Sequence, residues 1–167
     1  MNTEHFEIER KYLIAYPSLE MLKAYAEDTQ IVQTYLVAPE GETARVRKRG
    51  RGGQYVYTHT VKKRISDLTR IEDERVVDEA EYHRLLKTAD PKRNVIYKTR
   101  WCLPYQGQIF EIDLFPFWED RAIMEIEMEN EEQEILFPPQ ITVLREVSQD
   151  GRYTNSALSM QIPYDEL

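Results

Sequence analysis

Residues 7–11 read Glu7-Ile8-Glu9-Arg10-Lys11, inside an alternating run over residues 6–14 that predicts a first β-strand. Successive side chains of a strand point to opposite faces, so the two glutamates and the lysine share one face and apolar side chains occupy the other. Two carboxylates followed by an ammonium group in one row can hold a divalent cation together with the anion that accompanies it. A polar strand face is also common where a sheet meets water, so the later strands must decide between the two interpretations.

Length and composition bound the class of protein. With 167 residues, 41% hydrophobic and 31% charged, the chain matches a single globular domain over residues 1–167. It contains no apolar run of about 18 residues that could span a membrane, and its first residues lack the apolar centre of a signal peptide. The single cysteine, Cys102, permits no internal disulfide, so we expect a cytoplasmic protein.

Charge is unevenly distributed along the chain. The net charge of −8 argues against a general nucleic-acid binder. Residues 45–70 nevertheless contain nine Lys or Arg against Asp67 alone, and residues 111–134 contain ten acids against Arg121 alone. Blocks of opposite sign are either solvated surfaces that attract each other or two walls of one site.

Hydrophobic alternation predicts an α+β fold that is mainly antiparallel β. Helices are expected from Ser18 to near Asp28 and from Asp78 to just before Asp90-Pro91, with a short one near residues 155–160. Further strands are expected over residues 30–37, 43–49, 54–63, 70–77, 94–103, 108–115 and 121–129. About eight strands with hairpin-like spacing favour a closed eight-stranded barrel with a few helices packed outside, since closure removes exposed edges. We assign no chemistry to residues 17–42.

Rows of charged side chains recur on these strands, with apolar residues on the opposite faces. The rows are Arg45 and Arg47; Lys62; Arg70, Glu72 and Glu74; Lys98 and Arg100; Glu111 and Asp113; and Glu125, Glu127 and Glu129. An open sheet with cross-strand ion pairs would mix the signs, whereas here acids crowd together unless a cation lies between them. Oxygen ligands suit Mg²⁺ or Mn²⁺, and guanidinium and ammonium groups suit phosphate. Polyphosphate with a divalent metal satisfies both walls.

The order and spacing of these motifs resemble the CYTH superfamily, the triphosphate tunnel metalloenzymes, and in particular its bacterial inorganic triphosphatase branch. The resemblance covers nearly the whole chain. It begins with the ExExK signature at residues 7–11 and ends with Asp150-Gly151-Arg152-Tyr153-Thr154-Asn155. It implies that the closed barrel forms a charged tunnel.

The resemblance also implies roles for the charged rows. Metal ligands would be Glu7, Glu9, Asp113, Glu125, Glu127 and Glu129, and the triphosphate would be held by Lys11, Arg45, Arg47, Lys62, Lys98 and Arg100. Glu7, Glu9, Lys11 and Glu127 would be catalytic, and Arg70, Glu72, Glu74 and Glu111 would line the tunnel.

The expected activity is metal-dependent hydrolysis of a phosphoanhydride in inorganic triphosphate or a related organic triphosphate. The alternatives are a class IV-type adenylyl cyclase and a non-catalytic module that binds polyphosphate or nucleotide. His5, His59 and His83 stand at unrelated positions and give no competing catalytic triad or zinc site. We expect a small-molecule triphosphate as the partner, with no nucleic acid and no membrane, and a homodimer is left open.

Overall fold

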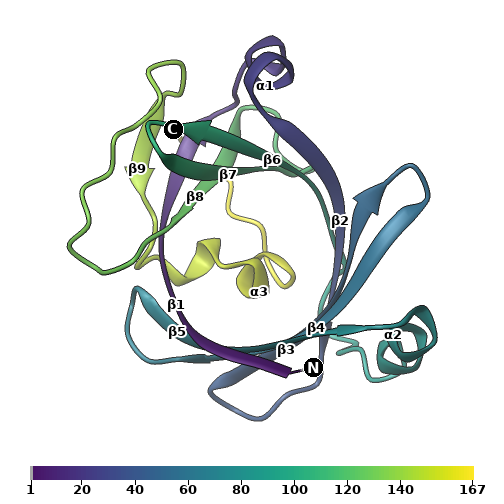
Figure 1. The fold of residues 1–167 in the computed structure, drawn as a ribbon. Helices are drawn as coiled ribbons and strands as arrows, with labels where there is room; N and C mark the ends of the chain where they lie inside the picture. The colour runs from purple at the N-terminus through teal and green to yellow at the C-terminus, as the bar shows by residue number, and fades with distance from the viewer. Residues whose placement is uncertain (1) are drawn as a thin grey trace.

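The computed structural model describes the backbone of residues 2–167 and the side chains of residues 6–167. Its strands form one antiparallel sheet that closes on itself, and Figure 1 looks along the axis of the resulting barrel. Around the barrel the order is β5-β4-β3-β2-β6-β7-β8-β1, and β1 pairs again with β5. The strands are β1 (Asn2–Ala15), β2 (Glu27–Leu36), β3 (Glu42–Arg51), β4 (Gln54–Arg64), β5 (Thr69–Val77), β6 (Ile96–Tyr105), β7 (Gln108–Leu114) and β8 (Arg121–Glu127). The predicted closed eight-stranded barrel is confirmed.

Strand β1 closes the barrel by changing neighbours along its length. Its first half pairs with β5, where Ile8 lies opposite Thr69, and from Glu9 onward it pairs with β8. A short ninth strand, β9 (Val143–Glu146), covers the edge of β1 that β5 has left, with Tyr12 opposite Glu146. Residues 7–11 therefore lie where the barrel closes, at the point where β1 changes its pairing from β5 to β8.

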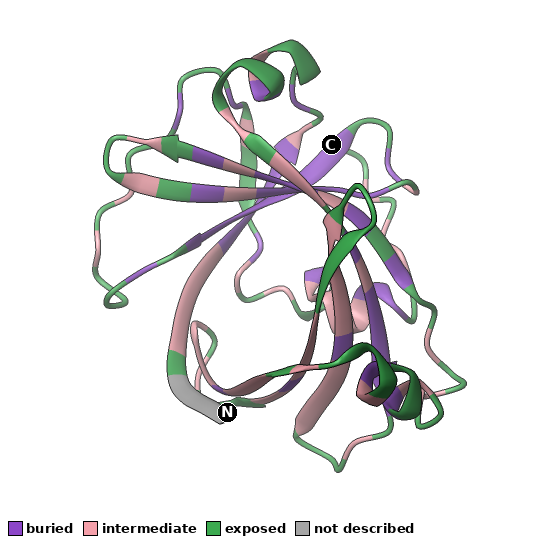
Figure 2. Ribbon diagram, turned by 45° about the vertical axis from the view of Figure 1, so that its right-hand side comes forward, coloured by how far each residue is buried: buried purple, intermediate pink, exposed green. Residues whose placement is uncertain are grey.

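The alternation of side chains places the main core outside the ring of strands. Apolar residues from β1, β6, β7 and β8, among them Ile14, Phe110, Ile112, Met124 and Ile126, form one buried cluster. Every residue of β8 except Glu127 is buried, whereas most of β3 is only half-buried, a contrast visible in Figure 2. The strands of the main apolar cluster are therefore more deeply buried than β3, although both groups carry charged residues on their inward faces.

Two helices pack on the outside of the barrel. Helix α1 (Leu19–Tyr25) is capped by Ser18, whose hydroxyl accepts from the Met21 amide, and buries Leu22. It ends before the predicted limit near Asp28, because β2 begins at residue 27. Helix α2 (Glu79–Leu86) begins at the predicted Asp78 cap and packs its buried Tyr82 against β2, β3 and β4. Neither these nor the other helices of the described chain could cross a bilayer.

The C-terminal segment lies within the ring of strands. It contains the 3-10 helix η1 (Gly151–Tyr153) and the short α3 (Asn155–Leu158), which Figure 1 shows inside the barrel. Tyr153 and Leu158 are fully buried with inward-facing Leu13, Ile96 and Ile123 in a second apolar cluster. The two longer helices thus pack outside as predicted, whereas α3 lies inside the ring because its apolar residues fill part of the interior.

Candidate functional site

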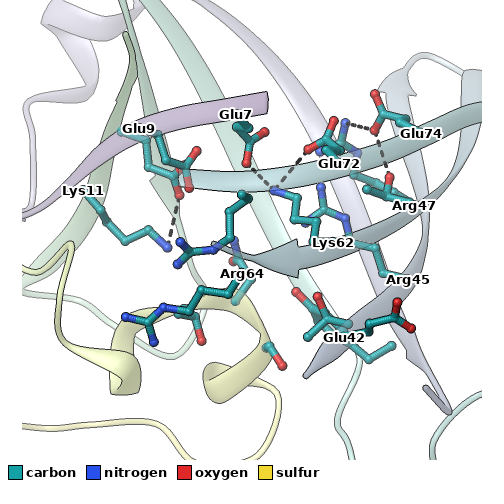
Figure 3. Close-up of a pocket in the computed structure, with 18 of the residues that line it drawn as sticks. Glu7, Glu9, Lys11, Glu42, Arg45, Arg47, Lys62, Arg64, Glu72 and Glu74 are labelled. Atoms are coloured by element: carbon teal, nitrogen blue, oxygen red, sulfur yellow. Dashed lines mark hydrogen bonds and ion pairs between the residues drawn. The ribbon is translucent and has the colours of Figure 1, made fainter. Parts of the chain in front are cut away.

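A charged cavity of about 620 Å³ occupies the interior of the barrel. Figure 3 shows side chains from strands far apart in sequence converging on it. Its lining residues include Glu7, Glu9, Lys11, Arg45, Arg47, Lys62, Arg70, Glu72, Glu74, Arg100, Glu111, Glu125 and Glu127. The structure thus brings most of the predicted rows onto one enclosed surface.

Lys62 joins the first strand to the basic wall. Its Nζ lies 2.7 Å from a carboxylate oxygen of Glu7 and 3.3 Å from one of Glu72, as Figure 3 shows. Lys62 and Glu72 are direct cross-strand neighbours on β4 and β5. Burial lowers the pKa of Lys62, but the surrounding carboxylates outweigh it and raise that pKa above its ordinary value. The lysine therefore stays charged and neutralises the acids beside it.

Carboxylates crowd where β1 meets β8. Glu9 lies directly opposite Glu127, and Lys11 lies opposite Glu125. Like charges in opposite positions repel, and burial together with Glu125 and Glu7 raises the pKa of Glu9 to about 8. Burial also disfavours ionised Glu125, but Lys11, at 3.5 Å, and Arg100 lower its pKa to about 2. Glu9 therefore keeps a proton at neutral pH that a bound cation would replace.

The opposite wall carries the arginines of β3. Burial and the charges of Arg45 and Arg100 lower the pKa of Arg47 to about 10. One Nη of Arg47 lies 3.9 Å from Glu74, which already accepts a 2.9 Å hydrogen bond from Thr60. Within the described part of the chain, the buried Nε atoms of Arg45 and Arg47 have no hydrogen-bond partner. A buried donor left unpaired costs roughly 1–3 kcal/mol, so this wall suits an anion with many acceptor oxygens.

Strands β6 and β7 hold a self-contained ionic cluster. Asp113 accepts from Lys98 Nζ at 2.7 Å and from Arg100 Nε and Nη2 at 2.8 and 2.9 Å. Lys98 also donates to Asn155 of α3 at 3.3 Å. Burial raises the pKa of a carboxyl group, but the two cations outweigh it and hold the pKa of Asp113 well below its usual range. Burial lowers the pKa of Lys98 to about 7.

Three of the predicted site residues lie outside the cavity lining. Lys98 and Asp113 are buried against each other, with side-chain exposures of 0% and 2%. Glu129 follows the end of β8, which stops at Glu127 rather than continuing to the predicted limit. It lines a neighbouring cavity of about 790 Å³, which shares Glu111 and Glu127 with the charged one. The structure therefore leaves these three out of the charged cavity's lining, although Asp113 bonds Arg100, which lines it.

Several lining residues escaped the sequence analysis. They are Tyr35, Thr43, Arg49, Thr60, Arg64, and Thr154, Asn155 and Ser156 of the C-terminal segment. Arg49 continues the alternation of Arg45 and Arg47 and could have been found by that signal. Tyr35 lies in a strand with no charged row, and the C-terminal residues reach the cavity only through tertiary structure.

The donor set can be tested against a divalent metal. In residues 6–167, no three acidic, histidine or cysteine side chains converge closely enough to form a ready-made metal site. Glu7 and Glu125 instead contact Lys62 and Lys11. Burial, followed by the charges of Glu125 and Glu7, raises the pKa of Glu9, and the two lysines do not offset that rise. These carboxylate oxygens suit a hard divalent cation. Binding it requires Lys11 and Lys62 to turn away from the carboxylates toward the anion that enters with the metal.

Comparisons with known proteins agree with this arrangement. No protein-family profile matches the chain. An inorganic triphosphatase of Nitrosomonas europaea is 32% identical over 161 residues, which cover 94% of this chain and 99% of that protein. An inorganic triphosphatase of Acetivibrio thermocellus is 28% identical, with 95% of both chains covered.

Solved structures share the fold. The crystal structure of the inorganic triphosphatase NE1496 superposes with a TM-score of 0.58 and 30% identity, covering 94% of this chain and 96% of that one. The PH1012 protein of Pyrococcus horikoshii gives a TM-score of 0.55 at 21% identity, with 74% and 80% covered. At that identity the second match concerns the fold alone.

Proposed function

This chain belongs to the inorganic triphosphatase family, and from that premise we propose that it hydrolyses a terminal phosphoanhydride bond of inorganic triphosphate inside the barrel. We also assign it to the CYTH superfamily. One observation carries the proposal: a single cavity has guanidinium groups on one wall and crowded carboxylates on another. A triphosphate with a divalent cation compensates both walls at once.

The basic residues of the cavity bind and orient the phosphate chain. Arg45 and Arg47 on β3 and Arg100 on β6 present guanidinium groups, and Lys11 and Lys62 add ammonium groups from β1 and β4. Fixed cations around a phosphoryl group stabilise the charge that spreads over its oxygens in the transition state. Lys98 is not in the lining, so we assign it to the support of Arg100.

Mg²⁺ or Mn²⁺ would be held by Glu7, Glu9, Glu125 and Glu127. Such a metal would supply Lewis-acid polarisation of the phosphate and of a water molecule. Glu9 would release its proton to solvent in holding the cation, and a cavity carboxylate would orient the attacking water. Asp113 and Glu129 are left out of this ligand set because both lie outside the cavity lining.

The proposal is tested by phosphate release from tripolyphosphate, ATP and thiamine triphosphate, each with Mg²⁺ or Mn²⁺. We expect the fastest release from tripolyphosphate and none in EDTA. Formation of cyclic AMP and pyrophosphate from ATP would identify a cyclase instead. Tight binding of tripolyphosphate without turnover under either metal would identify a binding module.

A further inference from the structure

Three inward-facing residues form one row across β2, β3 and β4. Arg47 lies directly opposite Gln33 on one side and Thr58 on the other. Side chains in opposite positions of antiparallel strands have Cβ atoms about 4.5–5.5 Å apart, so both neighbours can reach the side chain of Arg47. The three side chains therefore share one small region behind the cavity surface.

Each member of the row has an unpaired buried polar atom. Gln33 Oε1, Arg47 Nε and Thr58 Oγ1 all lack a hydrogen-bond partner among the residues that the structure describes. Gln33 is completely buried, and its other amide atom, Nε2, donates to Tyr35 Oη at 3.4 Å. That bond leaves Oε1 as a free acceptor, and Arg47 Nε–H is the unpaired donor of the row. Three neighbouring buried polar atoms without partners are uncommon, because nearly all buried polar groups in proteins form hydrogen bonds.

Arg47 is also weakly held at its tip. Its ion pair with Glu74 is long, 3.9 Å, and Glu74 is already bonded to Thr60. Neither Gln33 nor Thr58 lines the cavity, whereas Arg47 does. These two residues therefore act on a ligand only through side chains that line the cavity, which are Arg47 for both and also Tyr35 for Gln33.

We propose that a small rotation of these neighbouring side chains lets Gln33 Oε1 or Thr58 Oγ1 accept the Nε–H of Arg47, and that the two residues thereby act as positioning residues that direct its two Nη groups at the phosphate chain. This inference rests on the proposed function of the cavity and deepens it. A guanidinium held at Nε presents its remaining donors in a fixed fork, which matches the geometry of phosphate oxygens. An arginine without that support binds the same oxygens but must first be ordered.

The test compares Gln33→Leu and Thr58→Val, which remove the acceptors at nearly constant volume. For each variant we expect the KM for tripolyphosphate to rise about tenfold with little change in kcat, because a hydrogen bond to a charged group is lost. Thr58→Ser, which restores the hydroxyl, should return KM to the wild-type value. Matched controls are Thr99→Val and Gln30→Leu, whose side chains bond each other at 3.1 Å outside the cavity lining and should leave KM unchanged.

A double-mutant comparison tests whether the rise in KM caused by Gln33→Leu depends on Arg47. Arg47→Lys removes the Nε–H, so adding Gln33→Leu to it should change KM by less than about twofold. Equal effects of Gln33→Leu with and without Arg47→Lys would mean a general structural role and would overturn the inference. An unchanged KM in both single variants would overturn it as well.

A substrate-free readout separates this inference from the proposed function. The ¹⁵N resonance of Arg47 Nε–H, assigned by its loss in Arg47→Lys, should exchange slowly with water and should exchange faster in Gln33→Leu. If the wild-type chain released no phosphate while this difference held, the proposed function would fail and the positioning would stand. If the wild type and Gln33→Leu exchanged this proton at equal rates while the wild type hydrolysed tripolyphosphate, the positioning role would be wrong and the proposed function would stand.

Discussion

The Asp113 cluster on β6 and β7 and the arginine row on β3 began as the same kind of sequence pattern, yet the fold treats them differently. Asp113 accepts three hydrogen bonds of 2.7–2.9 Å from Lys98 and Arg100. Arg47 has one ion pair of 3.9 Å and an unpaired Nε within the described chain. Buried charges that strand register pairs with opposite charges stabilise the fold. Buried charges with few protein partners are instead available to bind a ligand.

Removing the acid of the satisfied cluster should have the largest effect on stability. Asp113→Ala leaves Lys98 and Arg100 buried without their common partner, so we expect a loss of about 3–5 kcal/mol in the free energy of unfolding. Urea denaturation measures it, with the exposed Glu119→Ala as control. A variant of normal stability that had lost affinity for Mg²⁺ would instead identify Asp113 as a metal ligand.

Removing an acid of the crowded site should affect turnover and spare the fold. Glu127→Ala should lower kcat by at least about a hundredfold, equivalent to roughly 2.7 kcal/mol in the barrier. Because Glu127 is exposed at the last position of β8, its truncation removes little packing, and thermal unfolding should shift little. Wild-type turnover in this variant would remove Glu127 from the metal site.

Glu9 predicts how stability depends on pH. Its carboxyl pKa is about 8 in the folded protein against an ordinary value of 4.5, so folding favours the protonated form. The metal-free protein should therefore lose stability, on the order of 3–4 kcal/mol, as pH rises from about 5 to 8. Glu9→Gln should flatten this part of the profile in EDTA. A profile of the same slope in that variant would assign the titration to another group.

Removing the side chain of Arg47 should have the smallest of these effects, and it should appear mainly in substrate binding. Arg47→Ala should raise the KM for tripolyphosphate about tenfold, roughly 1.4 kcal/mol, with a lesser change in kcat. Steady-state kinetics with saturating Mg²⁺ measures both constants. A variant that lost kcat while keeping its KM would show that Arg47 acts only in the transition state.

Alternation predicted the barrel and the charged rows, because strand parity decides which side chains share a face, and the resemblance to the triphosphate tunnel metalloenzymes placed those rows in a tunnel. Glu7, Glu9, Arg45 and Lys62 lie on the expected surface. Parity does not say which inward charges pair with one another, so Lys98 and Asp113 were predicted as ligands although they form a buried ion pair and register sets Asp113 opposite Arg100. Gln33 on β2 also faces inward but is uncharged, so the search for charged rows did not include it.

Sequence reasoning also missed contributions that depend on tertiary structure. Glu129 keeps the parity of β8 but follows the last paired residue. The C-terminal residues 154–156 reach the cavity because Tyr153 and Leu158 are buried among inward-facing apolar residues. No local pattern in the chain could have placed α3 inside the ring.

The change of neighbours along β1 has a consequence for how the chain is made. Residues 2–15 need partners on β5, β8 and β9, and the last of these ends at Glu146. During synthesis the N-terminal segment must therefore wait, unpaired along much of its length, until most of the polypeptide has left the ribosome. Such long-range pairing slows folding, so the ring is sealed last by a strand that precedes all of its partners in the chain.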